Sequence, residues 1–167
     1  SNPVRARFYE YPRFTYPWHF HSEYEIIYVE KGEGDCLVGD SIISYSKGDL
    51  ILFGSELPHS MQSPPDGGEE SDNEEKSELK VRGVNIQFEK DFMHYSISQY
   101  SQFIPIRNLL EDACRGIKFT ITRSGKIIKL LEQIPSAKGA DQIILLLSLL
   151  QMMATSNHKK YLTTSHY

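Results

Sequence analysis

Residues 17–34 read PWHFHSEYEIIYVEKGEG, and this stretch decides the fold of the 167-residue chain. The run YEIIYVEK is rich in β-branched and aromatic residues and stops at Gly32, which predicts a strand. His19 and His21 precede the run, and Glu25 has the same parity. Because alternate residues of a strand share a face, we expect these three side chains to converge.

Two imidazoles and one carboxylate are the ligand set that non-haem iron prefers and that zinc and manganese accept. A fourth candidate is His59, in GDLILFGSELPHS, since a turn and a short strand before it can return it to the same wall of a barrel. Two interpretations stay open. Either His19, His21, Glu25 and His59 bind a divalent metal, or they hydrogen-bond one another, the strand ends or a polar effector. No separate acid, base or oxyanion constellation is visible, so no catalytic residue is assigned and no cofactor is required.

The remaining sequence changes from strand to helix periodicity. GDCLVGDSIISYS predicts two strands joined at Gly39-Asp40, DLILF a third, and VRGVNIQFE a strand with one apolar face. Later, apolar spacing predicts a helix over 106–114, a second that Ser124 caps and Pro135 ends, and a third over 140–154. Short strands indicate a barrel or sandwich, and strands followed by helices indicate an α+β order.

Composition limits the partners of the chain. A net charge of −4 with no basic block gives no electrostatic footprint for nucleic acid. Two cysteines, Cys36 and Cys114, form neither a zinc-finger spacing nor a disulfide framework, which favours a reducing cytoplasm. The most apolar stretch, 143–154, is too short to span a bilayer, and no secretory signal is visible.

Residues 64–80 form a strongly acidic segment, with seven acidic residues against two lysines. Such a segment has too little apolar surface to offset the entropy of ordering it, so we expect a mobile acidic loop over 64–80. It is interpreted as a solvated hairpin tip or as a lid over a nearby pocket.

Two stretches carry a resemblance to cupins. HFHSEYEIIYVEKG matches the first cupin motif, H-x-H-x3-E-x6-G, at every fixed position, although Arg13 stands where a glycine usually precedes it. GDLILFGSELPH resembles the second motif, with Gly48 and His59 in place. Its usual proline, second glycine and final asparagine are replaced by Gly54, Glu56 and Ser63. The resemblance implies a mainly β fold, a cupin jelly-roll barrel (double-stranded β-helix) followed by C-terminal helices.

A narrower resemblance covers nearly the whole chain. These motifs, followed by LLEDACRGIKF and a leucine-rich last helix, resemble the N-terminal sensing domain of AraC-type transcription regulators. This implies a bacterial, cytoplasmic homodimer that binds a small, sugar-like effector in a barrel over 1–104 with an N-terminal arm. Residues 105–167 would pack on the barrel and dimerise, and DNA would be contacted only by a helix-turn-helix domain absent from this chain. The alternative is a small metal-dependent cupin enzyme, a dioxygenase or isomerase.

The resemblance also suggests further contact residues. Seven aromatic side chains lie between Phe8 and Phe20, and we interpret them as core packing or as a pocket wall and arm that closes over the effector. Trp18 and Phe20 are effector candidates, together with Arg82 on the VRGVNIQFE strand. With the arm closed over the effector, as the resemblance implies, Arg5 and Arg7 would meet an anionic group.

The last predicted helix is apolar nearly all round. Ile143, Leu146, Leu147, Leu150 and Ala154 form a wide apolar face, and Leu145, Leu149 and Met152 form a second. A single barrel covers one such face, so we expect the second to be the dimer interface. The alternative is that the preceding helix buries both faces within one chain.

Overall fold

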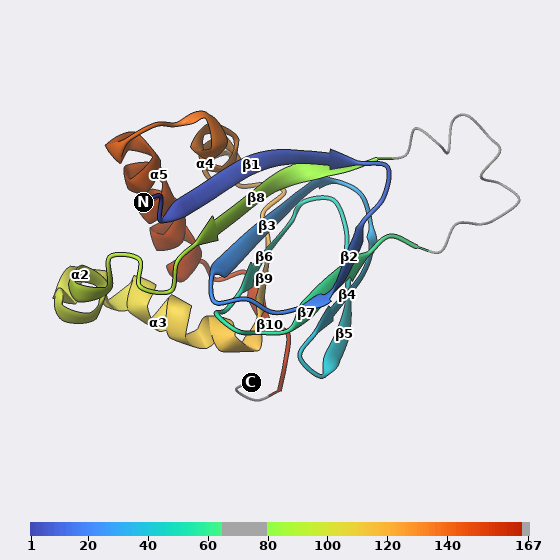
Figure 1. Cartoon of the computed structure of the whole chain (residues 1–167), viewed down its shortest axis with the longest axis horizontal. Helices are drawn as coiled ribbons and strands as arrows, with labels where there is room; N and C mark the ends of the chain where they lie inside the picture. Colours follow the sequence, from blue (N-terminus) through green and yellow to red (C-terminus); the bar gives the residue numbers. More distant parts are fainter. Residues whose placement is uncertain (65–79, 165–167) are drawn as a thin grey trace, which may run out of the picture.

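The computed structural model describes residues 1–64 and 80–164, so the predicted acidic loop lies almost wholly outside the described residues. Two antiparallel sheets face each other, with helices outside the larger one (Figure 1). The large sheet has the spatial order β1 (Val4–Tyr11), β8 (Val81–Phe88), β3 (Tyr24–Lys31), β6 (Asp49–Phe53), β9 (Ile117–Thr120) and β10 (Lys159–Tyr161). The small sheet has the order β2 (Thr15–His19), β7 (His59–Gln62), β4 (Gly34–Val38) and β5 (Ser41–Tyr45). This arrangement confirms the predicted jelly-roll barrel with C-terminal helices.

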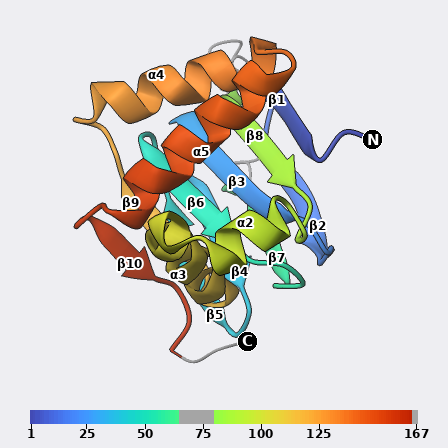
Figure 2. The ribbon, with the colours of Figure 1, turned by 90° about the vertical axis from the view of Figure 1, so that its left-hand side faces the viewer.

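The helices cover the outer face of the large sheet. Figure 2 shows α5 (Ala140–Ala154) lying across the strands beside α4 (Gly125–Gln133), with α2 (His94–Gln99) and α3 (Ile104–Asp112) near one end. Short 3-10 turns are η2 (Ser101–Phe103), η3 (Ala113–Arg115) and η4 (Ile134–Ser136). The three helices predicted from apolar spacing are confirmed. Ser124 caps α4 as predicted, because its hydroxyl accepts a bond from the Ile127 amide.

The small sheet, the large sheet and the helices form three layers, and an apolar core fills the space between each neighbouring pair. The core between the sheets includes Tyr9, Phe14, Ile27, Cys36, Ile51, Phe53 and Met61. The core between the large sheet and the helices includes Ile26, Leu52, Val84, Leu109, Leu131 and Leu149. Both faces of β3 and β6 are therefore covered, which explains why these strands read as continuous apolar runs rather than alternating ones.

The two motif glycines have a conformational role. Gly32 has φ of 128° and Gly48 has φ of 90°, values that favour glycine. A Cβ atom on Gly48 would also lie 2.2 Å from Cγ2 of Thr122. These turns end β3, which carries Glu25, and start β6, which the chain follows on its way to His59 on β7.

The structure corrects two boundaries. Residues 105–167 are not only helical, because β9 pairs with β6 and β10 pairs with β9, which extends the barrel sheet into this segment. The predicted N-terminal arm is also wrong for residues 4–11. These residues form β1, which pairs with β8 over its whole length, from Val4 opposite Phe88 to Tyr11 opposite Val81. A strand held by a full ladder of hydrogen bonds cannot act as a free arm.

The predicted dimer face on α5 also needs correction. Leu149 is 0% exposed in a single chain because α5 packs on the large sheet and against α3 and α4. Leu149 is therefore a core residue, and its assignment to a dimer interface is wrong. Leu145 and Met152 are half-buried, and Ile144 is 57% exposed. Leu145 and Met152 stay predicted contacts.

Across residues 1–64 and 80–164, no helix is long and apolar enough to cross a membrane.

Candidate metal centre

The four motif residues come together at the mouth of the barrel. His19, His21, Glu25 and His59 each offer one ligand atom, and these atoms all lie within 4.8 Å of one another. The predicted convergence is confirmed, but not by the predicted route. His19 ends β2 of the small sheet, His21 lies in the connection, and Glu25 belongs to β3 of the large sheet. The chain crosses between sheets here, so parity along one strand is not what brings the side chains together.

The three imidazole rings are oriented by backbone carbonyls. Nδ1 of His19 lies 2.6 Å from the Pro17 oxygen, Nδ1 of His21 3.0 Å from the Glu23 oxygen, and Nδ1 of His59 2.8 Å from the Leu57 oxygen. Because a carbonyl oxygen only accepts, each Nδ1 carries the proton and donates it. The Nε2 atoms are left to face the cluster, which is the orientation that metal-binding histidines adopt.

Two amide side chains fix Glu25. Its Oε2 accepts hydrogen bonds from Nδ2 of Asn85 at 2.8 Å and Nε2 of Gln87 at 3.1 Å. Its Oε1 faces the histidines, 2.6 Å from Nε2 of His59 and 3.4 Å from Nε2 of His21. The sequence analysis did not assign Asn85 and Gln87. The sequence did contain a sign of their role, because alternation along β8 places both polar residues on the face opposite its apolar face. In the structure, Gln87 is the direct cross-strand partner of Glu25.

The cluster perturbs its own titration. Burial alone would raise the pKa of the Glu25 carboxyl group, but His21, His59 and Asn85 outweigh burial and hold that pKa well below its usual range. The interaction with the Glu25 carboxylate raises the pKa of His21 above its ordinary value, against the opposing effect of partial burial. The site therefore favours a charged Glu25 at neutral pH.

The residues fit a divalent metal ion. Nε2 of His21 is buried and forms no hydrogen bond, and its neighbour Oε1 of Glu25 lies 3.4 Å away, so this atom is available as a ligand. Oε1 of Glu25 and Nε2 of His59 are 2.6 Å apart, which is a hydrogen-bond distance, so a metal ion would replace the proton that this contact holds. Metal bonds of about 2.1 Å in a tetrahedral arrangement separate ligand atoms by about 3.4 Å, so the most widely spaced atoms of the cluster, at most 4.8 Å apart, would have to move closer by about 1 Å when an ion binds.

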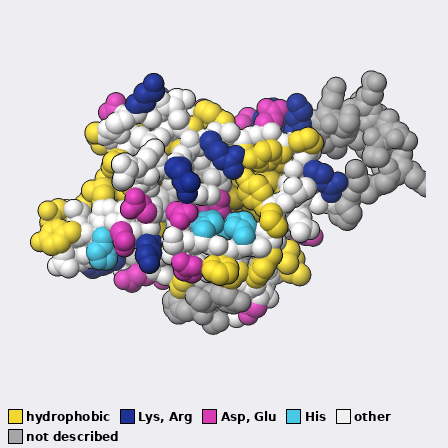
Figure 3. All heavy atoms as spheres, viewed as in Figure 1, with side chains coloured by type: hydrophobic (Ala, Val, Ile, Leu, Met, Phe, Trp, Pro, Cys, Tyr) yellow, Lys and Arg dark blue, Asp and Glu magenta, His cyan; other side chains and the backbone are white. Residues whose placement is uncertain are grey.

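Access to the centre is one-sided. Glu25 and His59 are buried, and the Phe53 ring stacks on the His59 ring with centroids 4.0 Å apart. His19 and His21 are half-buried and leave their side of the cluster open to solvent. A space-filling view shows histidine side chains at the surface of this face, bordered by basic, acidic and hydrophobic side chains (Figure 3). A ligand can therefore approach from the His19 and His21 side.

The other predicted effector residues lie apart from the cluster. Trp18 and Phe20 flank the inward-facing His19 in sequence and are 49% and 65% exposed, as expected for side chains directed outward. Their effector role stays a prediction. Arg82 is wrong as an effector contact. It shares the outer face of β8 with Val84, and its Nε atom lies 3.3 Å from a Glu30 oxygen.

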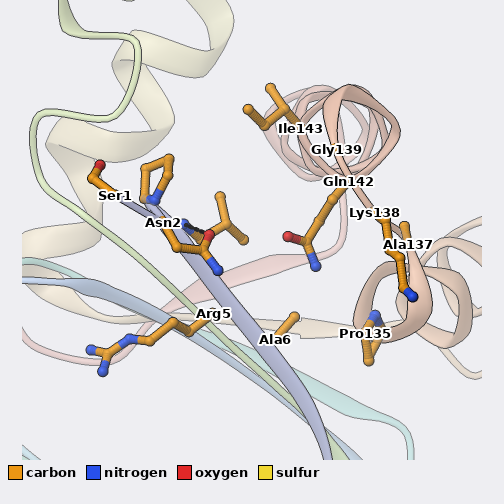
Figure 4. A pocket seen from close by; sticks show the side chains of 12 residues that line it. Ser1, Asn2, Arg5, Ala6, Pro135, Ala137, Lys138, Gly139, Gln142 and Ile143 are labelled. Carbon is orange, nitrogen blue, oxygen red and sulfur yellow. Dashed lines mark hydrogen bonds between the residues drawn. The ribbon is translucent and has the colours of Figure 1, made fainter.

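A separate cavity of about 640 Å³ lies on the helix side of β1 (Figure 4). The start of β1 and the turn from η4 into α5 line it, with Lys138 and Gln142 among its polar residues. The Arg5 guanidinium group points away from the α5 side of this cavity. The cavity contains no group of metal-ligating side chains like the one at the barrel mouth, so the candidate centre is the cluster.

The sequence identifies the class of domain. Residues 2–160 match the family model of the AraC-like ligand-binding domain. This chain therefore belongs to the AraC-like ligand-binding domain family, as its resemblance predicts.

Solved structures show the same fold. ToxT from Vibrio cholerae O395, bound to (E)-4-(8-methylnaphthalen-1-yl)but-3-enoic acid, is 12% identical with a TM-score of 0.57 over 91% of this chain and 56% of ToxT. ToxT from Vibrio cholerae strain SCE256, bound to an unsaturated fatty acid, is 17% identical with a TM-score of 0.57 over 90% of this chain and 52% of ToxT. The chain thus spans little more than half the length of these proteins. A comparison with curated proteins gives no match.

Proposed function

We propose that this domain senses a small effector at the barrel mouth, with a divalent cation held by His19, His21, Glu25 and His59 as part of the binding site. One observation carries the proposal. Three Nε2 atoms and one carboxylate oxygen converge, while every Nδ1 atom and the other carboxylate oxygen are already bonded elsewhere. A bound cation, which is zinc, iron or manganese by this ligand set, would supply an electrophilic position for an oxygen or nitrogen atom of the effector.

The protein's own residues would orient the effector. Glu25 and His59 close the inner side of the centre, and the half-buried His19 and His21 leave the outer side accessible. ToxT structures hold carboxylic acids, an unsaturated fatty acid and a naphthalenyl butenoic acid, rather than sugars. These relatives therefore do not support the sugar-like effector expected from the sequence, and we leave that effector out of the proposal.

The output would be transcriptional. The family assignment supports a regulator in the bacterial cytoplasm, in which this domain forms a homodimer and a helix-turn-helix domain outside the chain contacts DNA. Effector binding would shift the population of dimer arrangements by its difference in affinity for each of them. Leu145 and Met152 on α5 are the proposed contacts between subunits.

A second candidate function is a metal-dependent enzyme, a dioxygenase or isomerase. The observation that favours it is the same ligand set with one open side, which also suits a substrate. Turnover of a bound ligand by the metal-loaded protein, lost in a His21→Ala variant, would establish this function in place of sensing.

Metal analysis tests the proposed centre. Protein purified without an affinity tag should contain one equivalent of zinc, iron or manganese, and added chelator should lower its melting temperature. His21→Ala should remove the metal, because it deletes a ligand with a buried Nε2 atom. His94→Ala is the matched control, since His94 is exposed on α2 and lies outside the cluster. Substoichiometric metal in wild type, or equal metal in both variants, would refute the centre.

A further inference from the structure

Two arginines lie on the inner face of β1, next to the candidate centre. Val4 and Ala6 face the helix-side core, so the alternating Arg5 and Arg7 face the barrel side. The register continues across the large sheet: Arg5 lies opposite Gln87, and Gln87 lies opposite Glu25. One strand therefore separates each arginine from β3, a backbone distance of about 10 Å across two strand spacings.

Hydrogen bonds connect Arg5 to the cluster, and Arg7 reaches it through Tyr16, whose ring contacts His19. Nη2 of Arg5 donates to Oε1 of Gln87 at 3.3 Å, and Gln87 in turn donates to Glu25. Nη2 of Arg7 donates to the Tyr16 hydroxyl at 2.9 Å, and the Tyr16 ring centroid lies 6.4 Å from that of His19. The two guanidinium groups are thus linked to the histidines through Gln87 and Tyr16, and Figure 3 shows basic side chains near histidine side chains on this face.

The charges of the two arginines are balanced differently. Arg5 forms an ion pair with Glu23, at 3.3 Å. Arg7 instead donates to the hydroxyl groups of Tyr11 and Tyr16, which are uncharged at neutral pH. Within residues 1–64 and 80–164, no carboxylate pairs with Arg7. A guanidinium group has five N–H donors, so Arg7 has donors left for a further acceptor.

With a divalent cation in place, this surface carries excess positive charge. The cation contributes two charges and Arg7 one, and Glu25 cancels one of these, while Arg5 and Glu23 cancel each other. A neutral ligand leaves that excess uncompensated, whereas an anion offsets it. The rings of Tyr11 and Tyr16 lie beside Arg7, 6.2 Å apart, and provide an apolar surface for the rest of the ligand.

We infer that the effector is a small organic carboxylate with a hydrocarbon or aryl group, and that Arg7 is its counter-ion and the residue that sets this specificity. The planar guanidinium group matches a carboxylate in a bidentate geometry. The Tyr11 and Tyr16 hydroxyl groups hold the guanidinium group in place before the ligand arrives. This inference rests on the proposed function, since it names the ligand class of the same site.

Calorimetric titration of zinc-loaded protein tests the inference. The probes are benzoate and succinate, their neutral amides benzamide and succinamide, and D-glucose. We expect at least one acid to bind at least tenfold more tightly than its amide. Arg7→Gln should weaken binding of that acid by about 10- to 100-fold without changing zinc affinity. Arg7→Lys should restore part of the affinity, because it keeps the charge and loses the planar fork.

The matched control is Arg82→Gln, which removes an arginine from the outer face of the same sheet and should leave acid affinity unchanged. Retained zinc binding verifies that each variant is folded. Equal binding of acids and amides, preference for glucose, binding of no acid at millimolar concentration, or acid binding unaffected by Arg7→Gln would each overturn the inference. If wild type binds no zinc, the proposed metal centre fails. The same titrations on metal-free protein then decide the inference by the same criteria.

Discussion

Replacing Asn85 by leucine tests whether the barrel positions Glu25 for a metal. Asn85 is 3% exposed and donates the shorter of the two hydrogen bonds that Oε2 of Glu25 accepts. Leucine has a similar shape and no donor. The variant should leave Gln87 as the only amide holding the carboxylate, and Glu25 should rotate more freely away from the histidines.

The expected magnitude follows from the strength of that bond. A hydrogen bond to a charged group contributes about 1.5–3 kcal/mol. Mutating a residue that hydrogen-bonds a metal ligand typically lowers metal affinity by about 10- to 100-fold, which corresponds to about 1.4–2.8 kcal/mol. The two estimates agree, so Asn85→Leu should weaken zinc binding by about 10- to 100-fold.

Competition against a fluorescent zinc chelator measures this change at constant pH. Ser60→Ala is the matched control, because Ser60 lies beside His59 on β7, is equally buried, and has a hydroxyl group without a hydrogen-bond partner. Its zinc affinity should stay at the wild-type value. An Asn85→Leu variant that folds and binds zinc as tightly as wild type would show that the amide does not position Glu25.

Three further predictions concern the core, the pH response and DNA. Leu149→Glu should unfold the domain because it puts a charge in the helix-side core. The control Ile144→Glu, at a 57% exposed position, should stay folded, as measured by circular dichroism. A folded Leu149→Glu monomer would contradict the burial of Leu149. In the presence of a metal chelator, the lowered pKa of Glu25 stabilises the fold above about pH 4.3, and this contribution is lost as the pH falls. The raised pKa of His21 stabilises the fold below about pH 6.5, and this contribution is lost as the pH rises through the folded-state pKa. Denaturant midpoints from pH 4 to 9 should therefore peak in mild acid for wild type and be flatter for Glu25→Gln, and equal profiles would exclude this linkage. Residues 1–167 alone, with a net charge of −4, should show no sequence-specific binding to duplex DNA in a gel-shift assay, and salt-sensitive specific binding would contradict this.

The sequence alone determined the features that depend on local patterns. The apolar run after His21 identifies β3, the periodicity over 140–154 gives α5 with its observed bounds, and Ser124 marks the start of α4. The spacing of His19, His21 and Glu25 also identified the ligand candidates, because cupin motifs fix residue types at short separations. These features are visible in one sequence because each depends on residues close together in the chain.

Only the tertiary structure decided which side chains meet across strands. Asn85 reaches Glu25 from a strand sixty residues away, and that contact depends on the register between β3 and β8. The same applies to Leu149, which looked like a second apolar face until the sheet, α3 and α4 covered it. Arg7 and Tyr16 likewise meet between two different sheets. Periodicity within one segment shows which face of a strand or helix is buried, but which strand it pairs with and where a helix docks are set by packing over the whole chain.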